Sequence, residues 1–66
     1  METVLEIRNL LKRYGIFIYT GDRIGDLEMM EMELKDLYEA KLVDIHHYQK
    51  GLLILRREKA ELEEGV

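Results

Sequence analysis

The sequence predicts an all-α fold, a compact three-helix bundle that forms a single domain over residues 1–66. Apolar residues recur at spacings of three and four, which is the period of one helix face. Proline is absent and glycine occurs only five times, so few positions interrupt a helix. A residue that favours helix starts precedes each apolar stretch. A chain of 66 residues has room for one small core only.

The first helix is expected over about residues 3–14. Thr3 and Glu6 have the spacing of a capping box, in which a hydroxyl and a carboxylate satisfy free amides at the helix start. Gly15 is a suitable end, because glycine adopts the left-handed conformation that terminates many helices. The face expected to be buried carries Val4, Ile7, Leu10, Leu11 and Tyr14.

Residues 16–21 are expected to form an extended connection across one end of the bundle. They are rich in residues that favour strands, but a lone strand would have no partner. Side chains of an extended segment point alternately to opposite sides. Either Ile16 and Ile18 or Phe17 and Tyr19 should therefore be the less buried pair.

The second helix is expected over about residues 22–41, capped by Asp22 or by Thr20 just before it. Its buried face should hold Ile24, Leu27, Met30, Leu34, Leu37 and Tyr38. The opposite face is acidic, and Arg23 should pair with a neighbouring acid of that face. The acids are Asp26, Glu28, Glu31, Glu33, Asp36, Glu39 and Asp44.

The third helix is expected over about residues 44–61. Asp44 is a good N-cap, and Val43 and Tyr48 occupy the two positions of a hydrophobic staple. Three acids near the C-terminal end oppose the helix dipole, so the chain should fray after about Glu61. Short connections favour an up-down-up arrangement. The buried face should hold Ile45, Tyr48, Leu52, Leu55 and Leu62, with Gly51.

The composition excludes much catalytic chemistry. Cysteine and serine are absent, and both threonines are expected to act as helix caps, so no nucleophile is available. His46 and His47 diverge by about 100° on a helix and cannot chelate one metal ion together. We therefore expect a protein that is not an enzyme, with no catalytic residue, metal site, cofactor or small-molecule substrate.

The apolar runs predict no membrane partner. The longest are four residues, such as Ile16–Tyr19 and Leu52–Leu55, whereas a membrane-spanning helix needs about 20. The opening residues do not resemble a signal peptide. These features predict a cytoplasmic protein.

The distribution of basic residues suggests a nucleic-acid partner. The net charge is -4, but the acids concentrate between residues 24 and 44. If the first and third helices lie side by side, their cations form a positive strip, and nearby aromatics could stack on unpaired bases of single-stranded RNA or DNA. The negative net charge opposes this interpretation. The expected contact residues are Arg8, Lys12, Arg13, Tyr19, Arg23, Lys50 and Arg57.

The alternative is a protein-interaction or self-associating helical module, with a protein partner or a homodimer. Several apolar residues lie off the expected buried faces and would be available to a partner or a second copy. Methionine adapts well to such interfaces. These residues are Leu5, Met29, Met32, Leu53 and Ile54.

The string Phe-Ile-Tyr-Thr-Gly-Asp-Arg at residues 17–23, within the run from Tyr14 to Ile24, resembles the YqgQ family of short bacterial cytosolic proteins of unknown function. Asp26-Leu27-Glu28 and the later run Leu52–Arg56 extend the likeness over nearly the whole chain. The resemblance implies a compact three-helix bundle from a Gram-positive bacterium, in a family for which single-stranded nucleic-acid binding has been suggested. It implies no catalytic residues.

Overall fold

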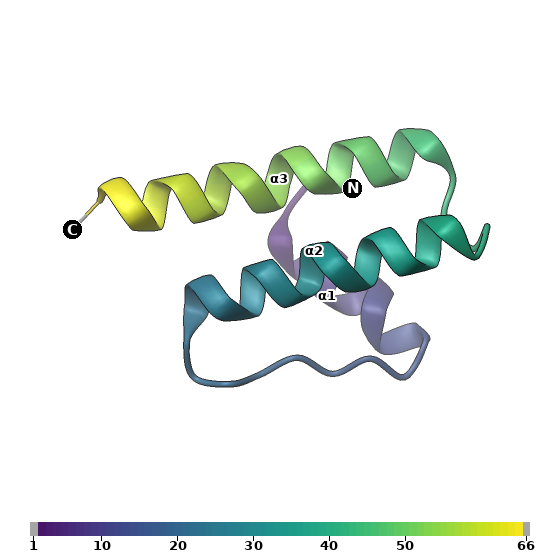
Figure 1. Ribbon diagram of the computed structural model, residues 1–66, viewed down its shortest axis with the longest axis horizontal. Coiled ribbons are helices and arrows are strands. Elements are labelled where there is room, and N and C mark those ends of the chain that lie inside the picture. Colours follow the sequence, from purple (N-terminus) through teal and green to yellow (C-terminus); the bar gives the residue numbers. More distant parts are fainter. Residues whose placement is uncertain (1, 66) are drawn as a thin grey trace.

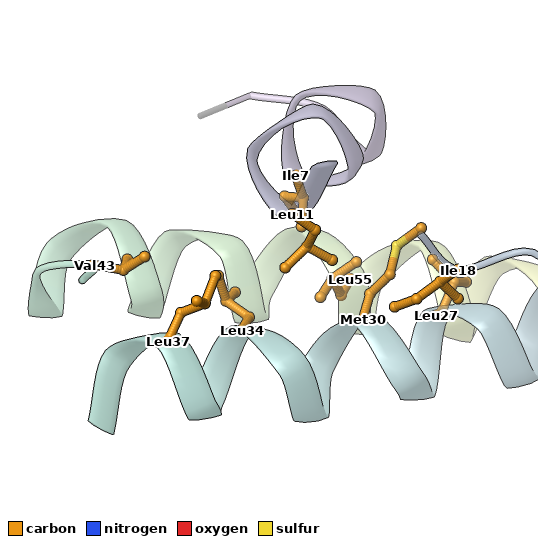
Figure 2. Packing of buried hydrophobic residues seen from close by; sticks show 9 residues of the cluster. All are labelled: Ile7, Leu11, Ile18, Leu27, Met30, Leu34, Leu37, Val43 and Leu55. Carbon is orange, nitrogen blue, oxygen red and sulfur yellow. The ribbon is translucent and has the colours of Figure 1, made fainter. Parts of the chain in front are cut away.

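The computed structural model describes residues 2–65 and confirms the three-helix fold (Figure 1). The helices are α1 (Val4–Arg13), α2 (Arg23–Glu39) and α3 (Ile45–Glu64), and no strand occurs between residues 2 and 65. α2 and α3 form an antiparallel hairpin, and α1 lies against one face of it (Figures 1 and 2).

The up-down-up expectation holds for α2 and α3 but not for α1. In Figure 2, α1 is seen nearly along its axis while the two hairpin helices run across the picture, so α1 crosses the hairpin instead of running along it. The extended connection makes this possible. It leaves the end of α1 and runs back beside α2 to the start of that helix (Figure 1), so the two helices need not lie antiparallel.

The core lies where α1 meets the groove between α2 and α3. Ile7 and Leu11 project from α1 into this groove (Figure 2). Both are fully buried, together with Met30, Leu34 and Leu55 of the hairpin. Ile18 and Val43, from the two connections, complete the buried cluster at its ends. The expected buried face of the second helix is confirmed, with Ile24 and Tyr38 half-buried at its edges.

Local hydrogen bonds fix the ends of α1 and α2. The Thr3 hydroxyl accepts the Glu6 N–H at 3.3 Å, as the capping box predicts. Gly15 has φ 77°, and the Ile16 N–H behind it donates to the Leu11 carbonyl at 3.0 Å.

α2 ends two residues before the predicted position. Lys41 adopts φ 64°, and the Leu42 N–H donates to the Leu37 carbonyl at 2.9 Å. This is the same left-handed closure that ends α1, here on a residue that is not glycine. The sequence signal for it is weak, because lysine rarely adopts a positive φ.

α3 continues to Glu64, so the expected fraying after Glu61 is wrong. Leu62 is half-buried and packs against the core. Lys59 lies 2.7 Å from the Glu28 carboxylate of α2, and this hydrogen bond raises the pKa of Lys59. Packing of the last turns against the start of α2 therefore outweighs their unfavourable charges.

Two residues are more exposed than their helix faces predict. Tyr14 and Ile45 are both exposed, because α1 and α3 place them at the rim of the core. Five more residues of the expected buried faces are only half-buried: Val4, Leu10, Tyr48, Leu52 and Leu62. The residues expected off the buried faces are indeed exposed, apart from Ile54, which is half-buried and packs against the core.

Asp44 caps α3 as predicted. Its carboxylate accepts the His47 N–H at 2.8 Å and lies 2.8 Å from the His47 Nδ1. The backbone hydrogen bond from His47 is the main reason that the pKa of Asp44 lies below its ordinary value of 3.8. Both histidines are exposed, as expected.

We expect Leu34→Ala to lower the free energy of unfolding by about 2–5 kcal/mol, since it leaves a cavity in the centre of the core. Leu52→Ala should cost less, because this side chain is half-buried. Urea denaturation followed by circular dichroism measures both. Leu5→Ala is the control at an exposed position and should change stability by less than about 0.5 kcal/mol. Equal losses at the three leucines would contradict the observed burial.

The Asp44 cap should make stability depend on pH in the acid range. Because folding lowers the pKa of Asp44 below 3.8, this carboxylate stabilises the fold above pH 3.8 and loses its effect as the pH falls through the lowered value. Asp44→Ser keeps a capping oxygen that does not titrate. The difference in melting temperature between wild type and Asp44→Ser should therefore shift in favour of the variant on going from about pH 6 to about pH 2.5. A constant difference would show that Asp44 does not titrate with folding.

Candidate nucleic-acid interface

Residues 16–20, the aromatic segment, carry the two most exposed aromatic side chains among the described residues. Ile18 is buried and Ile16 half-buried, whereas Phe17 is 73% and Tyr19 84% exposed. Of the two pairs of side chains that alternate along the segment, Phe17 and Tyr19 are therefore the less buried pair. Side chains two positions apart on an extended chain point to the same side, about 6.6 Å from each other. Phe17 and Tyr19 therefore present two rings to solvent on one side of the segment.

A buried carboxylate anchors the end of the aromatic segment. Asp26 of α2 is 5% exposed, and it accepts the Thr20 N–H at 2.9 Å and the Thr20 hydroxyl at 2.6 Å. The same hydroxyl accepts the Asp22 N–H at 3.2 Å. Asp22 holds the N-cap position of α2 without a side-chain cap bond. Thr20 therefore connects the segment to the first turns of α2.

The burial of Asp26 corrects the expectation that it belongs to the solvent-facing acidic surface. Asp26 stands one turn before Met30, which is fully buried, so the helix period alone puts it near the core. An acid at such a position needs a hydrogen-bond donor nearby. Thr20, six residues earlier in the sequence, offers such a donor, and it was the sequence signal that could have predicted the Thr20–Asp26 hydrogen bonds.

Arg23 pairs across the fold instead of along α2. Its guanidinium lies 2.9 Å from the Glu58 carboxylate of α3, which corrects the expected pairing with a neighbouring acid. Arg23 and Arg57 line one groove, the Leu5 groove, between the starts of α1 and α2 and the second half of α3. Its lining residues are Glu2, Thr3, Val4, Leu5, Arg23, Ile54, Arg57, Glu58 and Glu61.

Further cations lie beside the Leu5 groove. Arg8 and Lys12 follow Leu5 by three and seven residues, so they share its flank of α1. Neither they nor Arg57 form an ion pair with another residue between 2 and 65. Arg23 and Arg57 therefore line the Leu5 groove together with three carboxylates, while Arg8 and Lys12 lie on the flank of α1 that carries Leu5.

Arg13 and Lys50 have other surroundings. Arg13 lies on the opposite flank of α1 and lines a hollow with Asp44 and His47. Lys50 of α3 lies 3.1 Å from the Glu2 carboxylate, and this hydrogen bond lowers the pKa of Glu2. Arg13 therefore lies apart from the positive strip expected on α1 and α3, and Lys50 is already paired with an acid.

The other chemistry of the described chain is limited. Among residues 2–65, no three His, Asp or Glu side chains come together in a way that could hold a metal ion. Both threonine side chains take part in local hydrogen bonds. No helix in this range is long and apolar enough to cross a membrane.

Comparison with known proteins relates the chain to a bacterial family. The family model described as YqgQ-like matches residues 1–61. A protein of Bacillus subtilis (strain 168), named "Uncharacterized protein YqgQ", is 32% identical over 65 residues, which cover 98% of this chain and 92% of the relative. The match is to a bacterial protein of nearly the same length.

We expect Asp26→Ala to loosen the aromatic segment, because it removes the acceptor of the Thr20 N–H and hydroxyl. The loss of stability should be about 1–3 kcal/mol, the usual cost of leaving such groups unpaired. Amide hydrogen exchange should accelerate at Thr20 in particular. Thr20→Val is the matched control, since it removes the hydroxyl and keeps the backbone bond, and it should have a smaller effect. An Asp26→Ala chain with unchanged exchange at residue 20 would contradict the anchoring role.

Proposed function

We propose that this chain, which belongs to the YqgQ-like family, is a non-enzymatic protein that binds single-stranded nucleic acid. One observation carries the proposal. Phe17 and Tyr19 are 73% and 84% exposed on one side of an anchored extended segment, and this segment lies along the chain between Lys12 and Arg23. The name of the relative states no activity, so the support comes from the geometry of this chain.

The exposure of the two rings favours an unpaired strand. A base stacked on an aromatic side chain contributes about 1–3 kcal/mol to binding. In a duplex, paired bases stack on one another and hide their faces, so only unpaired bases can stack on Phe17 and Tyr19.

The anchoring of the segment reduces the cost of binding. Rings on a disordered loop would lose conformational entropy when a base stacks on them. Here Asp26 fixes Thr20, directly after Tyr19, at 2.9 and 2.6 Å. On the inner side of the segment, Ile18 packs in the core. The rings are thus held in place before the ligand arrives.

Cations on α1 and α3 supply the electrostatic attraction. Arg8, Lys12 and Arg57 have no partner acid among the described residues, so a phosphate would not have to displace one. The net charge of -4 and the acidic surface of α2 oppose a polyanion at long range. We therefore expect weak binding that depends strongly on salt, with affinity no better than micromolar at physiological ionic strength.

Fluorescence anisotropy with labelled single-stranded RNA and DNA in low salt tests this function. The double variant Phe17→Ala, Tyr19→Ala should weaken binding at least about tenfold, because both stacking faces are lost. A duplex of the same length should bind less well. With three unpaired cations, the logarithm of affinity should fall with a slope of about -2 against the logarithm of salt concentration.

Charge reversals provide the matched control. Lys12→Glu lies beside the aromatic segment and should weaken binding, whereas Lys35→Glu, an exposed lysine on the acidic side of α2, should have little effect. Circular dichroism should show that both chains remain helical. Absence of binding in low salt, or equal effects of the two reversals, would refute the proposed function.

A further inference from the structure

α1 covers only one face of the hairpin, and the other face carries exposed apolar side chains. We call it the open face, and Figure 1 looks onto it, with α1 behind α2 and α3. Met32 of α2 is 67% exposed and Leu53 of α3 is 66% exposed. Each stands two residues from buried residues on both sides along its helix, so its side chain points away from the core. Between the helices, the rings of Tyr38 and Tyr48 stack at 4.6 Å, and Met32 and Tyr48 line the same shallow hollow.

The charges of the open face are divided between the two helices. α2 contributes mainly carboxylates, Glu28 and Glu31, beside the one cation Lys35 that lines the same hollow. α3 contributes the cations Arg56 and Lys59, in the pairs Glu31–Arg56 at 2.8 Å and Glu28–Lys59 at 2.7 Å. The side chains of Glu28 and Arg56 remain more than half exposed. Each helix can therefore still attract a partner surface of the opposite sign.

These two features fit a second copy of the chain. We propose that the protein forms a two-fold symmetric dimer through the open face, with α2 of each copy packed on α3 of its partner. Each acidic helix then meets a basic one, and the same contact occurs twice. Any other partner would have to present an acidic helix beside a basic helix, placed so that each meets the helix of opposite charge. A second copy of the chain presents this arrangement by symmetry.

The ion pairs fix which residues would meet. Glu31 is level with Arg56 along the hairpin, so Met32, one residue further along α2, is level with about Leu55 and lies within one helical turn of the level of Leu53. A two-fold axis parallel to the helices preserves these levels. Met32 of each copy would then pack on Leu53 of the other, with Glu28 within reach of the other copy's Arg56.

The dimer would add buried apolar surface, of which the monomer has little. A domain of this size buries only about 60% of the surface of its unfolded chain, and here one face of the hairpin remains open. Two hairpins packed face to face give a four-helix arrangement with a second apolar layer. The aromatic segment and the Leu5 groove lie outside this contact, so the dimer does not depend on nucleic-acid binding.

Sedimentation equilibrium of the full chain, up to about 1 mM protein, tests the dimer. The wild type should dimerise with a dissociation constant in the micromolar range. Met32→Glu and Leu53→Lys should each raise that constant at least about tenfold, since each puts a charge against an apolar side chain. Both positions are about two-thirds exposed, so neither change disturbs the core of the monomer.

Mixing the two variants gives the decisive measurement. In a mixed dimer, one contact joins the introduced carboxylate to the introduced ammonium group, and the other keeps the native Met32 and Leu53. Dimerisation should therefore return to within about fivefold of wild type only in the mixture. Leu5→Lys, at a leucine of similar exposure (63%) on α1, is the control and should leave the constant unchanged. A monomeric wild type at the highest concentration, no recovery on mixing, or an equal effect at Leu5 would overturn the dimer.

Discussion

The fold depends on the insertion of Ile7 and Leu11 of α1 into the groove between α2 and α3. These two side chains are fully buried, and they hold a helix of only 10 residues against a hairpin that its own ion pairs already brace. Because α1 crosses the hairpin, the chain must return along α2 before the second helix begins. The position of the aromatic segment therefore follows from the packing of α1.

That segment shows how a small domain can keep large apolar rings in water. Ile18 and the backbone of Thr20 attach it from the inner side, through the core and through Asp26. The side chains on the outer side, Phe17 and Tyr19, are exposed and do not contribute to the buried cluster. Their exposure is unfavourable for the isolated chain, which is why we connect them with binding and not with folding.

Features set by neighbours in sequence could be predicted, and features set by distant contacts could not. The caps at Thr3 and Asp44 and the buried face of α2 follow from local chemistry and helix period, and all three are confirmed. The crossing of α1, the pair Arg23–Glu58 and the extent of α3 depend on packing between elements. At the candidate site, the cations were identified from sequence, but their grouping and the exposed pair of rings required the fold.

The one-sided attachment of α1 also has a consequence for folding kinetics. The hairpin is local in sequence and contains most of the interhelical packing, so it can form early and without long-range loop closure. α1 docks mainly through Ile7 and Leu11, with Val4 and Leu10 at the edge of the core, and is joined to the hairpin by an extended stretch. It is therefore the natural unit of partial opening, detaching and re-docking at a free energy below that of global unfolding. Amide protection should accordingly decrease from the centre of the hairpin to α1, which makes α1 the late-folding part of the molecule.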